Sequence, residues 1–207
     1  MTATPAPGEG AAPKTDGVSS PPDGAERPQR ADARRNRARL LEVAHEVFAA
    51  EGLAVPIDEI ARRAGVGPGT IYRHFATKEG LFQAVMRSRI AALVATARSL
   101  RDADDPGAAF FDFFTAMIRE ATGNKALAES VATEGLGFEL GDDSVPHELE
   151  QALDDLLRRA QRSGAVRTDV GPRDIKALLI GCMATEAFGV GDSSTGMVSV
   201  LRDGLRA

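Results

Sequence analysis

The sequence predicts an all-α fold of about nine helices, in which a three-helix head precedes a six-helix body. Apolar residues recur at spacings of three and four from about residue 32 to the end of the chain, which is typical of amphipathic helices. Glycine and proline separate these segments, and none of them alternates apolar and polar residues as a strand would. With 43% hydrophobic residues among 207, the chain can bury a sizeable core.

The first 30 residues differ in composition from the rest of the chain. They are rich in Pro, Gly, Ala and Ser and contain almost no large apolar side chains, so they bury too little surface to offset the entropy lost on ordering. We therefore predict a disordered tail over residues 1–30, a head over 31–77 and a body over 78–207.

The head is predicted to hold three helices, at about residues 32–51, 57–64 and 68–75. Their inward-facing apolar residues are Leu40, Leu41, Ala44, Val47, Phe48, Ile57, Ile60, Ala61, Ala64, Ile71 and Phe75. A glycine ends each of the first two helices, and the turn Gly65-Val66-Gly67 leads into the third. Two short helices joined by a tight glycine turn, after a supporting helix, are typical of a helix-turn-helix unit.

The body is predicted from the same periodicity. Thr77 is expected to cap its first helix, and Pro106, Pro146 and Pro172 to stand near the starts of later helices. The six expected helices lie at about residues 78–100, 106–122, 125–135, 146–163, 172–189 and 193–205.

The third helix of the head is expected to have an inward and an outward face. Ile71 and Phe75 share the inward face. The outward residues are Thr70, Arg73 and His74. Gly67 and Gly69 put no side chain between the helix N-terminus and a phosphate. Because the second helix of such a pair enters the major groove with its N-terminal residues, the head is predicted to bind DNA.

This head resembles a known family. The DNA-binding domain of the TetR family of transcriptional repressors is closely similar to the run from Ile57 to Phe82, IDEIARRAGVGPGTIYRHFATKEGLF. The likeness covers roughly residues 35–86, and it is specific because a glycine turn, Thr-x-Tyr, an aromatic residue and a following Lys-Glu fall in register. The rest of the chain resembles the family only in its number of helices.

The resemblance implies that the DNA-binding residues are Gly69, Thr70, Tyr72, Arg73, His74 and Lys78. Lys78 and the hydroxyl of Tyr72 would bind phosphates, and Arg73 would bind a base edge or a second phosphate. The chain departs from the family pattern at Pro56, where a Ser or Thr that caps the helix and contacts phosphate is common. It also departs at Pro68, where a polar residue often stands, so contacts to the DNA backbone are weakened.

The resemblance also implies a ligand-responsive repressor. A homodimer would occupy a palindromic double-stranded DNA operator until a small-molecule effector binds the body and favours a conformation that no longer matches the half-site spacing. An activator of the same fold remains an alternative. No cofactor is expected.

The charge distribution fits this function. A net charge of −5 argues against a protein that coats nucleic acid indiscriminately. Residues 31–78 hold eight basic and six acidic residues, a balance of +2, whereas residues 79–207 hold fourteen and twenty, a balance of −6. Cys182 is the only cysteine, and neither a signal peptide nor a membrane span is evident, so we expect a cytoplasmic protein with no membrane partner.

An enzyme is the main alternative class. The three histidines fall on separate predicted elements and no metal-ligand spacing or paired-carboxylate motif appears, so no catalytic or metal site is expected. The glycine turn follows a helix and lacks both G-x-G-x-x-G spacing and a Walker Lys-Ser/Thr, which disfavours a nucleotide site. A helical adaptor would leave the Thr-x-Tyr-x-His face unexplained. Tyr72 could instead be a half-buried prop of the head.

A small-molecule cavity is expected in the body. Its predicted lining is Phe82, Met86, Phe110, Phe114, Met117, Phe138, Leu153 and Leu157. Phe and Met form adaptable apolar walls. The acidic balance of the body weakly favours a neutral or cationic ligand, with Glu134 and Glu139 as candidate counter-charges. The alternative is that these side chains fill an ordinary core.

The last two helices are expected to form the homodimer interface as a four-helix contact with their two-fold mates. Gly181, Ala184 and Ala187 give a strip of small residues that permits close approach. The apolar residues expected at the interface are Leu178, Leu179, Met183, Met197, Val198, Leu201 and Leu205. The alternative is that these helices complete the core of the monomer.

Overall fold

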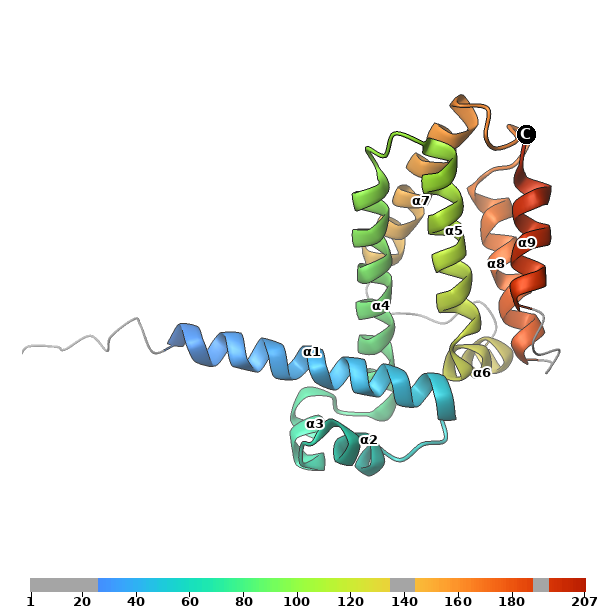
Figure 1. Cartoon of the computed structure of the whole chain (residues 1–207). Helices are drawn as coiled ribbons and strands as arrows, with labels where there is room; N and C mark the ends of the chain where they lie inside the picture. Colours follow the sequence, from blue (N-terminus) through green and yellow to red (C-terminus); the bar gives the residue numbers. More distant parts are fainter. Residues whose placement is uncertain (1–25, 135–143, 188–193) are drawn as a thin grey trace, which may run out of the picture. The chain divides into compact units, whose positions relative to one another are not determined.

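The computed structural model describes residues 26–134, 144–187 and 194–207, and all of its regular elements in these ranges are α-helices. They are α1 (Glu26–Glu51), α2 (Ile57–Ala64), α3 (Pro68–His74), α4 (Lys78–Leu100), α5 (Pro106–Thr122), α6 (Lys125–Glu134), α7 (Ser144–Arg162), α8 (Pro172–Ala187) and α9 (Ser194–Leu205) (Figure 1). The predicted all-α fold is confirmed. None of these helices is long and apolar enough to cross a membrane.

The chain divides into two compact units, Met1–Arg35 and Asn36–Ala207. The described part of the first unit is the start of α1, where Arg35 forms an ion pair with Asp32 one turn earlier. The helix begins at Glu26, so the last residues of the predicted tail are helical. Pro28 is tolerated in a first turn, and the surrounding Glu, Gln, Arg and Ala residues favour helix propagation from a stable segment.

A first group of buried side chains, the head cluster, joins α1, α2, α3, the first turns of α4 and the start of α6. Its buried members are Leu40, Leu41, Ala44, Val47, Phe48, Val55, Ile57, Ile60, Ala61, Ala64, Ile71, Phe75, Leu81, Phe82, Ala84, Val85, Met86 and Ala126. The rings of Phe48 and Phe82 meet edge to face, with their centroids 5.4 Å apart. Because α4 contributes to this cluster as far as Met86, the predicted head is completed by side chains that follow residue 77.

A second group, the body cluster, joins the later part of α4 to α5, α7, α8 and α9. Its buried members are Ala97, Phe110, Phe111, Phe113, Phe114, Met117, Ile118, Leu153, Leu156, Leu157, Ala160, Val166, Ile175, Cys182 and Leu205. All four phenylalanines of α5 are buried, because this helix packs against α4, α6, α7, α8 and α9 (Figure 1). A helix that is apolar around most of its circumference is stable only in such a central place.

A partly buried ionic network links α1, α4 and α5. The carboxylate of Glu120 accepts hydrogen bonds from Arg89 at 2.7 and 3.0 Å and lies 3.2 Å from Nε2 of His45. Burial acts to raise the pKa of Glu120, but the hydrogen bonds from His45 and Arg89 outweigh it and lower the pKa to about 2. Glu120 therefore stays ionised and holds α5 to the two other helices.

The predicted starts of three helices are present. The Oγ1 of Thr77 accepts a hydrogen bond from the N–H of Gly80 at 3.0 Å and caps α4, as the sequence predicted. Pro106 and Pro172 are the first residues of α5 and α8. At α5 the carboxylate of Asp105 also accepts from the N–H of Ala108 at 2.9 Å.

Candidate nucleic-acid interface

The turn between α2 and α3 has the geometry that the glycines predicted. Gly65 ends α2 with φ of 69°, a left-handed conformation that side chains other than glycine rarely adopt. The N–H of Val66 returns to the carbonyl of Ala61 at 3.0 Å, which closes the helix end. After this turn α3 begins at Pro68, whose missing N–H costs nothing at the first helical position.

Helix α3 has the two faces that the sequence predicted. Ile71 is fully buried and Phe75, which follows the helix, is 8% exposed, so both hold α3 against the head cluster. The residues on the outer side are exposed or partly exposed, and they are Gly69, Thr70, Tyr72, Arg73 and His74. The helix therefore presents a polar and aromatic surface that its own packing does not use.

Tyr72 is the most informative residue of this surface. Its side chain is 53% exposed, one of the two large hydrophobic residues that stand out at the surface of the described chain. This exposure leaves the side chain accessible to a partner.

The glycines at the start of α3 are not explained by the packing of the chain itself. A Cβ atom added to Gly67 or Gly69 would meet nothing within 4 Å, and neither residue has a positive φ. The open space in front of them leaves the N-terminus of α3 free for close approach by another molecule, as DNA binding requires.

Lys78 is placed next to this surface by the start of α4. It is the first residue of α4, directly after the Thr77 cap, and it is partly buried. An ammonium group at a helix N-terminus gains nothing from the helix dipole, so the dipole does not stabilise Lys78 there.

The basic pair of α2 is engaged within the head. Arg62 binds Glu59 at 2.6 and 2.8 Å, and Arg63 binds Glu59 at 2.7 Å and also pairs with Glu51. The hydrogen bonds from Arg62 and Arg63 lower the pKa of Glu59 to about 2. Pro56 provides no side-chain cap for α2.

One basic residue near the site was not among the predicted contacts. The guanidinium of Arg37 lies over the ring of Phe75, 5.6 Å from its centroid, and so stands beside the C-terminal end of α3. The basic run of Arg34, Arg35, Arg37 and Arg39 in the sequence was the signal, but periodicity alone could not show that one of them reaches α3.

The residues predicted to line a ligand cavity fall into two groups. Phe82 and Met86 belong to the head cluster. The members in the body cluster are Phe110, Phe114, Met117, Leu153 and Leu157. Phe110 and Phe114 are fully buried and stacked with their centroids 6.0 Å apart. Phe138 and the candidate counter-charge Glu139 lie outside the described residues.

The residues predicted at a dimer interface lie mostly at the edge of the body cluster. The partly buried ones are Leu178, Leu179, Met183, Met197, Val198 and Leu201. Leu205 differs, because it is 3% exposed and belongs to the core of the single chain. On α9 the side chain of Val200 is 71% exposed, and a Cβ added to Gly181 of α8 would meet nothing within 4 Å.

The fold and the surface of α3 define the chain as a helix-turn-helix protein of the DNA-binding class. Models of known families agree: bacterial regulatory proteins of the tetR family match residues 40–85, and the C-terminal domain of SbtR-like transcriptional regulators matches residues 105–207. A TetR transcription regulatory protein from Mycobacterium vanbaalenii has a crystal structure with 47% sequence identity, covering 87% of this chain and 100% of that one, at a TM-score of 0.68.

A second solved structure, a TetR transcriptional regulator from Streptomyces coelicolor, has 30% identity over 82% of this chain and 98% of that one, at a TM-score of 0.65. An HTH-type transcriptional regulator of Staphylococcus aureus (strain USA300) is 35% identical over 74 residues, which are 35% of this chain and 40% of that protein. The chain belongs to the TetR family of transcriptional regulators. It is accordingly a DNA-binding transcription factor and not an enzyme.

Proposed function

We propose that this chain is a ligand-responsive repressor that binds a palindromic operator as a homodimer through α3. The observation that carries the proposal is the division of α3 between a buried Ile71 and an exposed Tyr72. The helix is anchored by one face, and its other face has a DNA-contacting composition and no internal role. Thr70 and Arg73 are proposed to read bases, while Tyr72 and Lys78 bind phosphates.

A gel-shift assay with the DNA upstream of the protein's own gene tests this function. The wild type is expected to shift that fragment at concentrations where a scrambled fragment of equal length stays free. Arg73→Ala should reduce the preference, whereas Arg158→Gln, a control at an exposed arginine of α7, should keep it. Equal binding of the two fragments by the wild type would refute specific recognition.

The homodimer is proposed to form through α8 and α9. Three observations support this: Val200 is exposed, the space in front of Gly181 is open, and other apolar residues of α8 and α9 are only partly buried. Isolated exposed residues of this kind are ordinary, but apolar residues on two helices that both pack on α5 fit an isologous interface. Val200→Glu should give a monomer in light scattering, and Ala108→Glu, at an exposed position on α5, should leave the dimer intact.

The effector is proposed to be a small apolar molecule that binds within the body cluster. Phe110 stacks on Phe114 there, so a ligand has to separate side chains that now pack together. It would do so by selecting a more open body, and it would release DNA only if that conformation fits the operator less well. Phe82 and Met86 belong to the head cluster and are proposed to transmit such a change along α4.

A further inference from the structure

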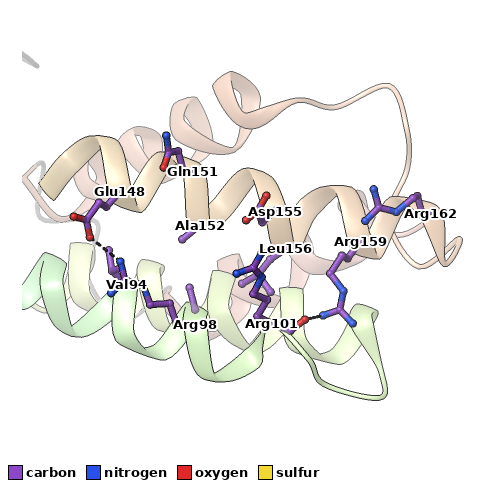
Figure 2. A pocket seen from close by; sticks show the side chains of 11 residues that line it. Val94, Arg98, Arg101, Glu148, Gln151, Ala152, Asp155, Leu156, Arg159 and Arg162 are labelled. Carbon is purple, nitrogen blue, oxygen red and sulfur yellow. Dashed lines mark hydrogen bonds and ion pairs between the residues drawn. The ribbon is translucent and has the colours of Figure 1, made fainter. Parts of the chain in front are cut away.

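A groove between α4 and α7 lies at the surface beside the body cluster, and it shares only Ala97 and Leu156 with that cluster's buried residues. It encloses a hollow of about 260 Å³ (Figure 2). Its floor is apolar and consists of Val94, Ala97, Ala152 and Leu156. Ala97 and Ala152 contribute only a methyl group each, from opposite helices. The space that larger side chains would fill is therefore open at the surface.

The rim of this groove is charged, and its charge is opposite to that of the body. Four arginines and two carboxylates line it, which gives a local balance of +2. Residues 79–207 together carry −6. Figure 2 shows Glu148 at one end, where it pairs with Arg98 at 3.0 Å, and Arg159 and Arg162 toward the other. The excess positive charge is thus concentrated at the end that lies near the C-terminus of α4.

One arginine at this end has a structural role. Arg159 donates hydrogen bonds to the backbone carbonyl of Arg101 and, at 3.1 Å, to that of Ala103. Arg101 is the C-cap of α4 and Ala103 follows it, so the guanidinium lies at the C-terminal end of the helix, where the helix dipole favours a cation. Arg159 is therefore held in place, and its charge stays in the groove whether or not a ligand is bound.

Two further arginines at the same end have no such role. The side chains of Arg101 and Arg162 are exposed, and neither forms an ion pair or hydrogen bond with the described residues. Asp155 is the one carboxylate near them in the lining. The guanidinium fork is well suited to bind a planar carboxylate through two parallel hydrogen bonds.

We propose that this groove binds a small organic acid, whose apolar part lies on the alanine-lined floor and whose carboxylate is held by Arg101 and Arg162. The hollow is smaller than the ~300 Å³ at which pockets for drug-sized ligands begin, so the ligand is about the size of a substituted aromatic ring. The acidic balance of the whole body does not oppose this, because charges beyond a Debye length of about 8–10 Å are screened.

A pair of fluorinated probes tests the proposal on the full chain. Binding of 4-(trifluoromethyl)benzoate and of the neutral 4-(trifluoromethyl)benzamide is measured by fluorine NMR titration. The two probes share an apolar ring and differ in the anionic group. The carboxylate is expected to bind at least about tenfold more tightly than the amide, because charge-assisted hydrogen bonds are roughly twice as strong as neutral ones.

Variants locate the binding. Arg101→Gln with Arg162→Gln should reduce the affinity for benzoate to that for benzamide. Arg119→Gln with Arg173→Gln removes the same charge from exposed positions outside the groove and should leave the benzoate affinity unchanged. Ala152→Phe, which fills the floor, should abolish binding of both probes in protein that circular dichroism shows to be folded.

Three results would overturn the assignment: equal affinity for both probes, full benzoate affinity in the Arg101 and Arg162 double variant, or equal losses in that variant and in its charge-matched control. The site does not rest on the proposed repressor function, because these titrations contain no DNA. A failed gel shift would leave the groove unaffected, and a failed titration would leave operator binding unaffected.

Discussion

The head and the body of this chain bury their apolar side chains in different ways. The buried side chains of the head cluster are mostly Ala, Val, Ile and Leu, and the outer face of α3 is not used for packing. In the body cluster, α5 is surrounded and all four of its phenylalanines are buried. The function of single residues can therefore be inferred for α3, whose outer side chains do not pack within the chain. It is much harder to infer for α5, whose large apolar side chains are all buried in the core.

Truncation of the body cluster should give the largest effect. Phe110 is fully buried and stacked on Phe114, so Phe110→Ala is expected to lower the free energy of unfolding by about 3–5 kcal/mol. Chemical denaturation measures this. A loss of unfolding free energy below about 1 kcal/mol would mean that Phe110 lines an existing void. Truncation in a filled core creates a new cavity and costs more.

The ionic network between the head cluster and the body should give the next largest effect. The pKa of Glu120 is lowered from 4.5 to about 2, so its ionised form stabilises the fold above pH 4.5. This stabilisation is lost as the pH falls from 4.5 toward 2. Glu120→Gln should cost about 1–3 kcal/mol at pH 7, the usual contribution of hydrogen bonds to a charged group.

The pH dependence of that difference provides the check. Denaturation of the wild type and of Glu120→Gln at several pH values should show the two stabilities converging as the pH falls below 4.5. Glu148→Gln is a suitable control, because this exposed carboxylate pairs with Arg98 at the surface, where ion pairs contribute little. A Glu120→Gln cost that is constant from pH 7 to pH 3 would contradict the role of its charge.

Removal of one helix cap from the head and one from the body should give smaller effects on stability. Thr77→Ala and Asp105→Ala should each cost about 1 kcal/mol, the usual effect of a lost N-cap. Only Thr77→Ala should also weaken DNA binding, because this cap positions the first turn of α4 and Lys78 with it. If Thr77→Ala and Asp105→Ala weakened DNA binding equally, the weaker binding would come from lower stability and not from the position of Lys78.

The smallest expected effects concern single phosphate contacts. Lys78→Ala and Tyr72→Phe should each weaken binding about two- to tenfold, the range of one hydrogen bond of roughly 0.5–1.5 kcal/mol. The loss should be the same for operator and unrelated DNA, and the unfolding free energy should not change, since Tyr72 is 53% exposed. Unchanged affinity in both variants at moderate salt would contradict the docking of α3 on DNA.

Much of the head could be predicted from the sequence, because its signals are local. The glycine turn, the alternation of Ile71 and Phe75 with polar residues and the Thr77 cap each depend on a few neighbouring residues. The stacking of Arg37 on Phe75 joins α1 to the end of α3, and no local pattern encodes such a contact.

The body was predictable only as a series of helices. Periodicity located α5, but it could not show that this helix lies at the centre and buries all four phenylalanines. The predicted cavity grouped Phe82 with Phe110 because both are apolar and lie on neighbouring helices, whereas they belong to different clusters. The α4–α7 groove was also missed. Its lining residues come from two segments that are far apart in the sequence, and no local pattern shows that small side chains of both segments meet there.

The most direct test of α3 as the DNA-reading helix is a fluorescence anisotropy titration of a labelled operator duplex at several salt concentrations. Affinity should fall steeply with salt, as expected when a dimer replaces about 6–10 counterions. Arg73→Ala should reduce the ratio of operator to scrambled-duplex affinity, while Arg158→Gln should not change it. A ratio near one for the wild type, or an affinity that does not depend on salt, would contradict the assignment of α3.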